Sequence, residues 1–111
     1  MESVIAKRYA KALLGLVEAN TALEAVAQDL SGLAEAYSSN EDFQLFIKEP
    51  KFQLAAKATS MGQITKELGF GELVQKFSRF LISKHRFELI ELIAVAFDRL
   101  ALERLGKGRA R

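Results

Sequence analysis

Residues 4–19, VIAKRYAKALLGLVEA, form a stretch of helix length in which the polar residues are few and closely clustered. At about 100° per residue, the polar side chains and the glycine share one arc of the helix, made up of Lys7, Arg8, Lys11, Gly15 and Glu18. The other positions form two apolar arcs, with Ile5, Tyr9, Ala12, Leu13 and Leu16 in one and Ala6, Ala10, Leu14 and Val17 in the other. A surface helix needs a single apolar stripe of about 100° to face its own domain. The presence of a second apolar arc indicates a binding surface. A helix at the centre of a bundle has the same pattern, however, and periodicity leaves both interpretations open.

The length and composition are typical of one compact globular domain. The chain has 111 residues, of which 50% are hydrophobic and 27% are charged, with one proline and no cysteine. The absence of cysteine excludes disulfides and thiolate metal sites. No apolar run approaches the roughly 18 residues that span a bilayer, and the N-terminus lacks the layout of a signal peptide, so we expect no direct membrane insertion.

The positive charge is concentrated at the C-terminal end. Four of the 16 basic residues lie in residues 104–111, and 12 basic against 14 acidic residues remain in residues 1–103. A nucleic-acid-binding domain usually places its basic residues on a folded face. We therefore predict a folded domain over residues 1–105, followed over residues 106–111 by a basic tail or the start of a linker.

The remaining periodicity predicts further helices and no strand. The predicted helices cover residues 4–19, 22–37, 42–49, 51–68, 71–84 and 86–105. Short connections between amphipathic helices are typical of an all-α fold, here a compact six-helix bundle.

Polar residues, Pro50 and glycines mark the expected helix boundaries. The predicted capping residues are Ser3 for the first helix, Asn20 and Thr21 between the first two, and Ser39 or Asn40 for the third. Pro50 is expected to end the third helix, and Gly69 and Gly106 to end the fourth and sixth.

Phe80 lies at the edge of the apolar face of the predicted fifth helix. That face carries Leu73, Val74, Phe77 and Leu81. A large aromatic side chain at such an edge either seals the core or reaches into a groove, and the first is the commoner case.

The sequence shows no catalytic constellation. His85 is the only histidine, so a nucleophile with its base, or a metal site, would have to be built from carboxylates and serines. We expect no enzyme activity, no metal and no cofactor. His85 itself lies where one helix gives way to the next, and a positive side chain there complements a helix C-terminus.

Particular residues resemble a known family. The opening stretch, Ala6 to Leu13, and the later stretch KFSRFLISKHRF, from Lys76 to Phe87, are similar to the delta subunit of the rotary F-type ATP synthase, called the oligomycin-sensitivity-conferring protein in mitochondria. Three further features fall in the same order along the chain, namely Gln28-Asp29-Leu30, Lys48-Glu49-Pro50 and Lys57. The sequence departs from the family pattern with Lys76 in place of Asn, His85 where Gly is frequent and Phe87 in place of Leu.

The resemblance implies a stator function without catalysis. It implies that an N-terminal six-helix domain binds the N-terminal helix of the alpha subunit in an apolar groove between helices 1 and 5. A C-terminal domain absent from this chain would hold peripheral stalk subunit b. Residue by residue, it implies that Tyr9, Ala12 and Phe80 line the groove, with Ile5, Leu16, Lys76 and Lys84 on neighbouring positions. The alternative for Tyr9 is a core aromatic whose hydroxyl reaches the surface.

Two other functional classes are weighed against the stator. A small helical nucleic-acid-binding domain would place Lys76, Arg79, Lys84 and Arg86 on phosphates, and its affinity would fall steeply with salt. An enzyme would need an acidic or serine-based site. Because Met1 leads directly into the first helix without a transit segment, we expect a bacterial protein. The resemblance then implies a peripheral location at the cytoplasmic face of the inner membrane, as part of the ATP synthase complex.

Overall fold

The computed structural model of the chain describes residues 3–107, and within this range the fold is the predicted all-α bundle of six helices. The α-helices are α1 (Val4–Leu16), α2 (Leu23–Ser39), α3 (Glu41–Lys48), α4 (Leu54–Glu67), α5 (Glu72–Ser83) and α6 (Ile90–Lys107). Two short 3-10 helices, η1 (Asn20–Ala22) and η2 (Phe87–Leu89), precede α2 and α6.

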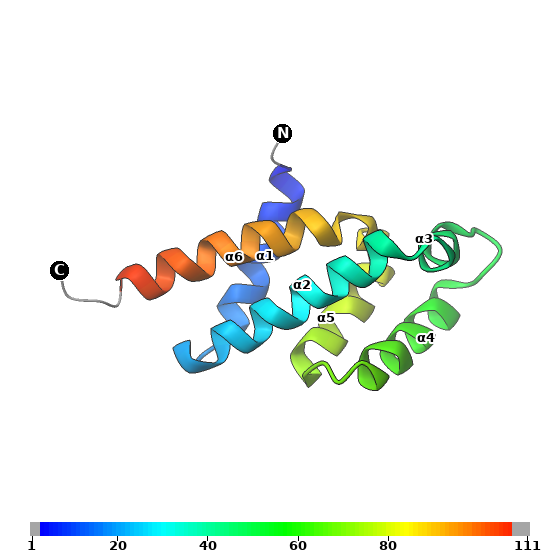
Figure 1. The fold of residues 1–111 in the computed structure, drawn as a ribbon. Coiled ribbons are helices and arrows are strands. Elements are labelled where there is room, and N and C mark those ends of the chain that lie inside the picture. Colours follow the sequence, from blue (N-terminus) through cyan, green and yellow to red (C-terminus); the bar gives the residue numbers. More distant parts are fainter. Residues whose placement is uncertain (1–2, 108–111) are drawn as a thin grey trace.

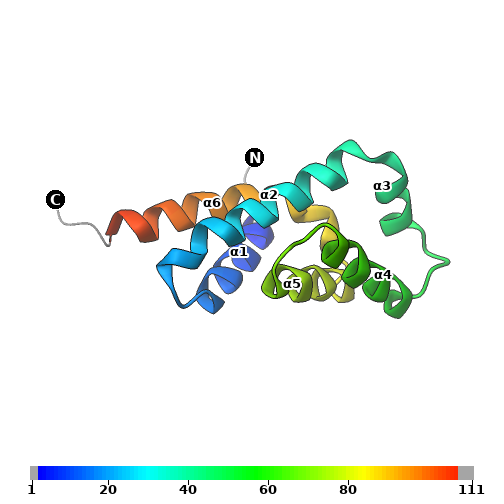
Figure 2. The same cartoon turned by 60° about the horizontal axis from the view of Figure 1, so that its bottom comes forward.

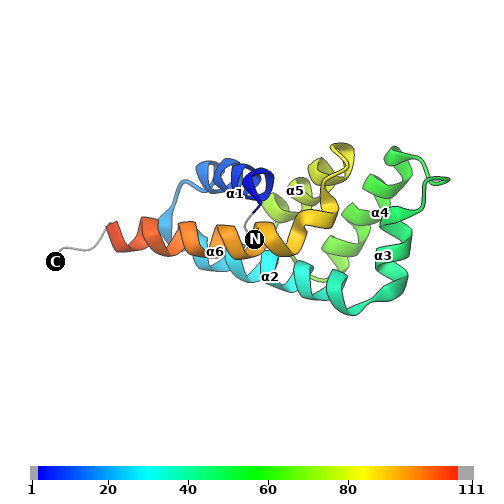
Figure 3. The same cartoon turned by 90° about the horizontal axis from the view of Figure 1, so that it is seen from above.

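The helices pack in pairs. Helices α2 and α6 run side by side along the length of the molecule, and α4 packs against α5 (Figure 1). Helix α1 packs against α6, and it lies on the same side of the α2 and α6 pair as α5 (Figures 2 and 3). Helix α3 covers the end of α2 that is far from α1. This arrangement leaves α1 and α5 as neighbours, each packed mainly on a different helix.

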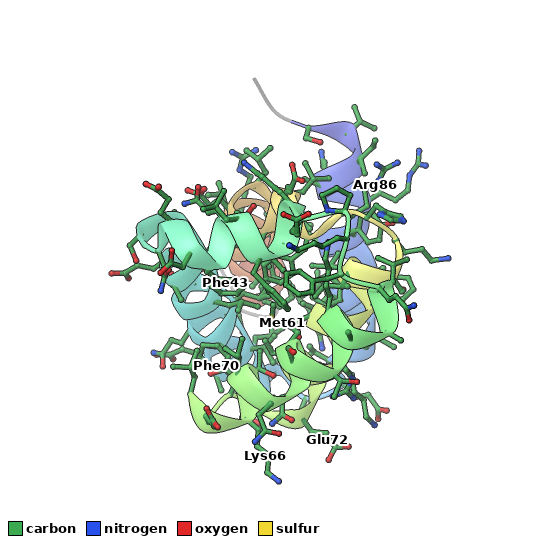
Figure 4. The ribbon with its side chains drawn as sticks, turned by 90° about the vertical axis from the view of Figure 1, so that its right-hand side faces the viewer. Phe43, Met61, Lys66, Phe70, Glu72 and Arg86 are labelled. Carbon is green, nitrogen blue, oxygen red and sulfur yellow. The ribbon has the colours of Figure 1, made fainter. Side chains whose placement is uncertain are left out.

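One of the two apolar arcs of α1 faces the core. Ala6, Ala10 and Val17 are buried, and Leu13 joins them from the other arc, whereas Leu14 is only half-buried. These residues belong to the same apolar cluster as the large buried side chains of the other helices, which include Leu30, Met61, Leu81, Phe87, Ile93 and Phe97. In Figure 4, Met61 and Phe43 point into this interior, and Lys66 and Glu72 point away from it.

The first helix ends earlier than predicted. Ser3 caps its start as expected, since the Ser3 side-chain oxygen accepts a hydrogen bond of 3.1 Å from the Ala6 N–H. The helix stops at Leu16, not near residue 19, because Val17 adopts an extended conformation that places its side chain in the core. Asn20 does not cap the next helix either, since α2 begins after η1 without a side-chain cap.

The boundaries of α3 agree with the sequence. The Asn40 carboxamide oxygen accepts a hydrogen bond of 3.0 Å from the Phe43 N–H, so Asn40 and not Ser39 is the capping residue. Glu49, directly before Pro50, is extended, and the helix ends at Lys48.

The fourth helix begins three residues later than predicted. Residues 51–53 form a turn and bend, and α4 starts at Leu54. Its end agrees with the prediction, because Gly69 has a φ of 81°, a left-handed conformation that glycine adopts without steric cost.

The sixth helix differs from the prediction at both ends. Residues 87–89 are a 3-10 turn, and α6 then continues through Gly106 to Lys107. Gly106 therefore does not terminate the helix. The rest of the predicted basic tail, residues 108–111, lies outside the described residues.

Candidate functional site: an apolar groove between helices α1 and α5

An open groove of about 390 Å³ runs between α1 and α5. It forms because α1 is packed on α6 and α5 on α4, so the two helices lie beside each other without interlocking (Figure 3). The side chains that line it are Ala12, Leu13, Leu16, Leu73, Lys76, Phe77 and Phe80. All but Lys76 present only carbon atoms, so the wall of the groove is apolar.

Two large apolar side chains of the groove remain open to solvent. Leu16 is 63% exposed and Phe80 is 45% exposed. Leu13 and Phe77 are buried and form the floor. Apolar surface that is exposed on both walls of a concave site is the usual mark of a binding groove.

Four residues of the predicted site lie together in this groove: Ala12, Leu16, Lys76 and Phe80. The exposed Ala12 lies on α1, four residues before Leu16, and its small side chain leaves room for a helix to approach closely. Phe80 reaches the groove from the margin of α5, so it does not simply seal the core.

The other three predicted residues lie around this site. The rings of Tyr9 and Phe80 meet edge to face with their centroids 6.0 Å apart, and Tyr9 is half-buried. The Lys84 ammonium lies 5.6 Å from the centroid of the same Phe80 ring. Ile5 is 40% exposed and is not among the residues that line the groove.

Sequence reasoning missed three lining residues, Leu13, Leu73 and Phe77. The apolar pattern predicts Leu73 and Phe77 on the core face of the fifth helix, and it gives Leu13 no site role although Leu13 shares an arc with Ala12 and Leu16. Their spacing carried a signal, because Leu73, Phe77 and Phe80 are separated by four and three residues and so follow one line along the helix.

The charged side chains near the groove are mainly basic. Lys76 pairs with Glu72 at 2.9 Å, and this hydrogen bond and the positive charge of Lys76 lower the pKa of the Glu72 carboxyl. The Lys84 ammonium lies over the ring of Phe80, which lines the groove. The groove is thus apolar inside with a positive margin.

The end of α5 is built with an unusual backbone at His85. The His85 N–H donates to the Ile82 carbonyl at 3.0 Å and the Arg86 N–H donates to the Leu81 carbonyl at 2.8 Å. This pair of bonds is the Schellman motif, in which the residue after the helix cap is left-handed. His85 has a φ of 57°, so it occupies the position that glycine usually fills.

The described part of the chain supplies no metal cluster. Residues 3–107 contain no group of three or more His, Cys, Asp or Glu side chains placed to hold a metal ion. Over the same residues, no helix has both the length and the apolar character needed to cross a membrane.

Comparison with known proteins identifies the family. Residues 5–111 match the family "ATP synthase delta (OSCP) subunit". The chain is 32% identical over 108 residues to the ATP synthase subunit delta of Lysinibacillus sphaericus, covering 97% of this chain and 60% of that protein.

Two other relatives give the same result. The chain is 29% identical over 107 residues to the ATP synthase subunit delta of Syntrophobacter fumaroxidans, covering 96% of this chain and 58% of that protein. It is 29% identical over 96 residues to the chloroplastic ATP synthase delta chain of Chlamydomonas reinhardtii, covering 86% and 44% respectively. The chain thus spans roughly half the length of these relatives, and it belongs to the ATP synthase delta (OSCP) subunit family.

Proposed function

We propose that this chain is a non-catalytic stator component of the rotary F-type ATP synthase, and that it binds the N-terminal helix of the alpha subunit in the groove between α1 and α5. The observation that carries the proposal is the apolar groove itself, with Leu16 and Phe80 exposed on opposite walls of a chain that belongs to the delta subunit family.

The groove suits one face of an amphipathic helix. Such a helix docks by placing apolar residues from successive turns into a hydrophobic groove. Completing the burial of a side chain such as Leu16 or Phe80 contributes about 1 to 2 kcal/mol, since full burial of a large apolar side chain is worth roughly 1.5 to 3 kcal/mol. Several contacts of this size give a stable attachment that needs no chemistry at the interface.

The charged side chains beside the groove indicate which charge the docking helix should carry. Lys76 lines the groove and Lys84 lies over the ring of Phe80, while Glu72 forms an ion pair with Lys76. A docking helix with acidic residues beside its apolar face is therefore favoured over a basic one. The same basic side chains flank an apolar groove and not a continuous phosphate-binding face, which favours a protein partner over nucleic acid.

The place of the domain in the complex follows from this contact. A domain that binds the catalytic head in this way can hold the head in place against the torque of the rotor. We propose that the remainder of the delta subunit joins the peripheral stalk through subunit b, and that the complex places this domain at the cytoplasmic face of a bacterial inner membrane as a peripheral component.

The proposal is tested by titrating the 111-residue chain with a peptide that copies the first ~20 residues of the cognate alpha subunit, a length set by one amphipathic helix. In Ala12→Asp an unpaired charge lies where the helix docks, so we expect a folded chain whose binding is weakened by several kcal/mol. Phe80→Ala removes an aromatic anchor and should cost roughly 2 kcal/mol of binding.

Matched controls separate the groove from general effects. Ala56→Asp introduces the same charge at an exposed helical alanine of α4, and Phe52→Ala removes an exposed ring outside the groove. Both should bind as the unaltered chain does. A folded Ala12→Asp chain that binds normally, or an unaltered chain that binds no peptide, would contradict the proposal.

A further inference from the structure

The last turn of α1 has no side chain of its own that stabilises its carbonyl groups. Of its carbonyl groups, that of Leu14 accepts a hydrogen bond of 3.1 Å from the Val17 N–H, and a basic residue in the final turn is a common further stabilisation of such a helix end. The last turn of α1 contains no basic residue, and it contains Gly15, a weak helix former. Leu16, the final residue of the helix, is nevertheless part of the groove wall.

Arg104 of α6 supplies a basic partner for this end of the helix from far along the chain. Its Nη1 donates to the carbonyls of Val17 at 2.7 Å and Leu14 at 3.2 Å, and its Nη2 donates to the carbonyl of Glu18 at 2.9 Å. Its Nε donates to the side-chain oxygen of Asn20 at 2.8 Å. One guanidinium group thus holds the C-terminal end of α1 and the turn that follows it.

We propose that Arg104 is a positioning residue for the groove: it fixes the last turn of α1 and so holds Leu16 in the place where the docking helix needs it. This inference rests on the proposed function of the groove. Arg104 acts through the backbone next to Leu16 and is not itself among the residues that line the groove.

The fold explains why this role is separable from overall stability. Helix α1 is anchored to the core by the buried side chains of Ala6, Ala10 and Leu13, and Val17 is buried directly after the helix. Loss of the guanidinium therefore leaves these core contacts in place and removes only the hydrogen bonds to the carbonyls at the end of the helix. Lysine cannot replace arginine here, because its single ammonium lacks the planar fork that reaches several carbonyls at once.

The first measurement is hydrogen exchange of the 111-residue chain. In Arg104→Ala, the amides of residues 14–17 should exchange on the order of tenfold faster, while buried amides of α2 and α6 keep their rates. Arg104→Lys should resemble Arg104→Ala. Asn20→Ala removes one acceptor and should have a smaller effect. Unchanged exchange at residues 14–17 would overturn the inference.

The second measurement asks whether Arg104 acts through Leu16. Arg104→Ala should weaken binding of the alpha-subunit peptide by roughly 2- to 30-fold, the range for substitutions that act on a site without touching its ligand. A double-mutant cycle then separates the walls of the groove. The effect of Arg104→Ala should disappear in a Leu16→Ala background and persist in a Phe80→Ala background. Equal, additive losses in both backgrounds would overturn the inference.

The two measurements also distinguish this inference from the proposed function. If the unaltered chain binds no peptide, the groove proposal fails, and with it the role of Arg104 in binding. Exchange at residues 14–17 then still decides whether Arg104 holds the end of α1. If the unaltered chain binds and Arg104→Ala binds equally well, only the positioning role fails.

Discussion

Replacement of His85 by glycine should make this protein more stable. His85 follows the end of α5 with a φ of 57°, while its counterpart at the end of α4, Gly69, has a φ of 81°. Both residues complete the same hydrogen-bond motif, since the Gly69 N–H donates to the Lys66 carbonyl and the Phe70 N–H to the Thr65 carbonyl, each at 3.0 Å. One motif therefore carries glycine and the other a residue with a side chain.

The backbone conformation sets the size of the effect. A residue with a Cβ atom loses about 1 to 2 kcal/mol in the left-handed region. Removing this strain stabilises the His85→Gly variant. Part of the stabilisation is lost, because glycine gives the unfolded chain additional conformational freedom worth about 0.4 to 1 kcal/mol. The net stabilisation expected for His85→Gly is about 0.5 to 1 kcal/mol, or roughly 2 to 8 °C in the thermal midpoint of a domain of this size.

Two further variants assign the effect to the backbone. His85→Ala removes the imidazole but keeps the Cβ atom, so its stability should stay below that of His85→Gly. Gly69→Ala introduces a Cβ atom at the equivalent position and should destabilise the chain by about 1 kcal/mol. Denaturant unfolding followed by circular dichroism measures all three. A neutral or destabilising His85→Gly, or an alanine variant as stable as the glycine variant, would refute the reasoning.

The other predictions concern a buried lysine and a buried tyrosine. Lys57 is buried and its Nζ donates to the Ile47 carbonyl at the end of α3 at 2.8 Å, so Lys57→Met should reduce the free energy of unfolding by about 1.5 to 3 kcal/mol, measured by denaturant unfolding. Burial, and then the charges of Glu88 and Glu91, raise the pKa of Tyr37. The folded state therefore holds the Tyr37 proton more tightly than the unfolded state does. The contribution of Tyr37 to the free energy of unfolding is fully present below about pH 10, the ordinary tyrosine pKa, and is lost as the pH rises above it. Tyr37→Phe should make the free energy of unfolding depend less on pH between about pH 9 and 11, and an unchanged dependence would contradict this.

Local patterns in the sequence were sufficient to predict the helices and most of their ends. The spacing of apolar residues predicted all six, and Ser3, Asn40, Pro50 and Gly69 act at helix ends as their chemistry requires. These signals are reliable because they depend on neighbours within one helical turn. The second apolar arc of the first helix could be predicted for the same reason, since a helix face is defined by the spacing of neighbouring residues.

The groove could be defined only from the sequence pattern and the packing of the helices together. The two apolar arcs of α1 are nearly equivalent in the sequence, and only the packing of α1 on α6 decides that Ala6, Ala10 and Val17 face the core. The position of α5 beside α1 then makes Ala12, Leu16 and the residues of α5 into two walls of one site.

The long-range polar contacts were decided by the tertiary structure alone. Arg104 was expected in a basic terminal region, yet it holds the end of α1 from 84 to 90 residues away in the chain. Asp29 of α2 likewise accepts a hydrogen bond of 2.9 Å from the Gly71 N–H at the start of α5. Such contacts leave no periodic trace, because a hydrogen bond depends on where two segments meet in space and not on their spacing in the sequence. The sequence by itself determined the helices and their apolar faces, and the packing of those helices determined where α1 ends and which face it leaves open.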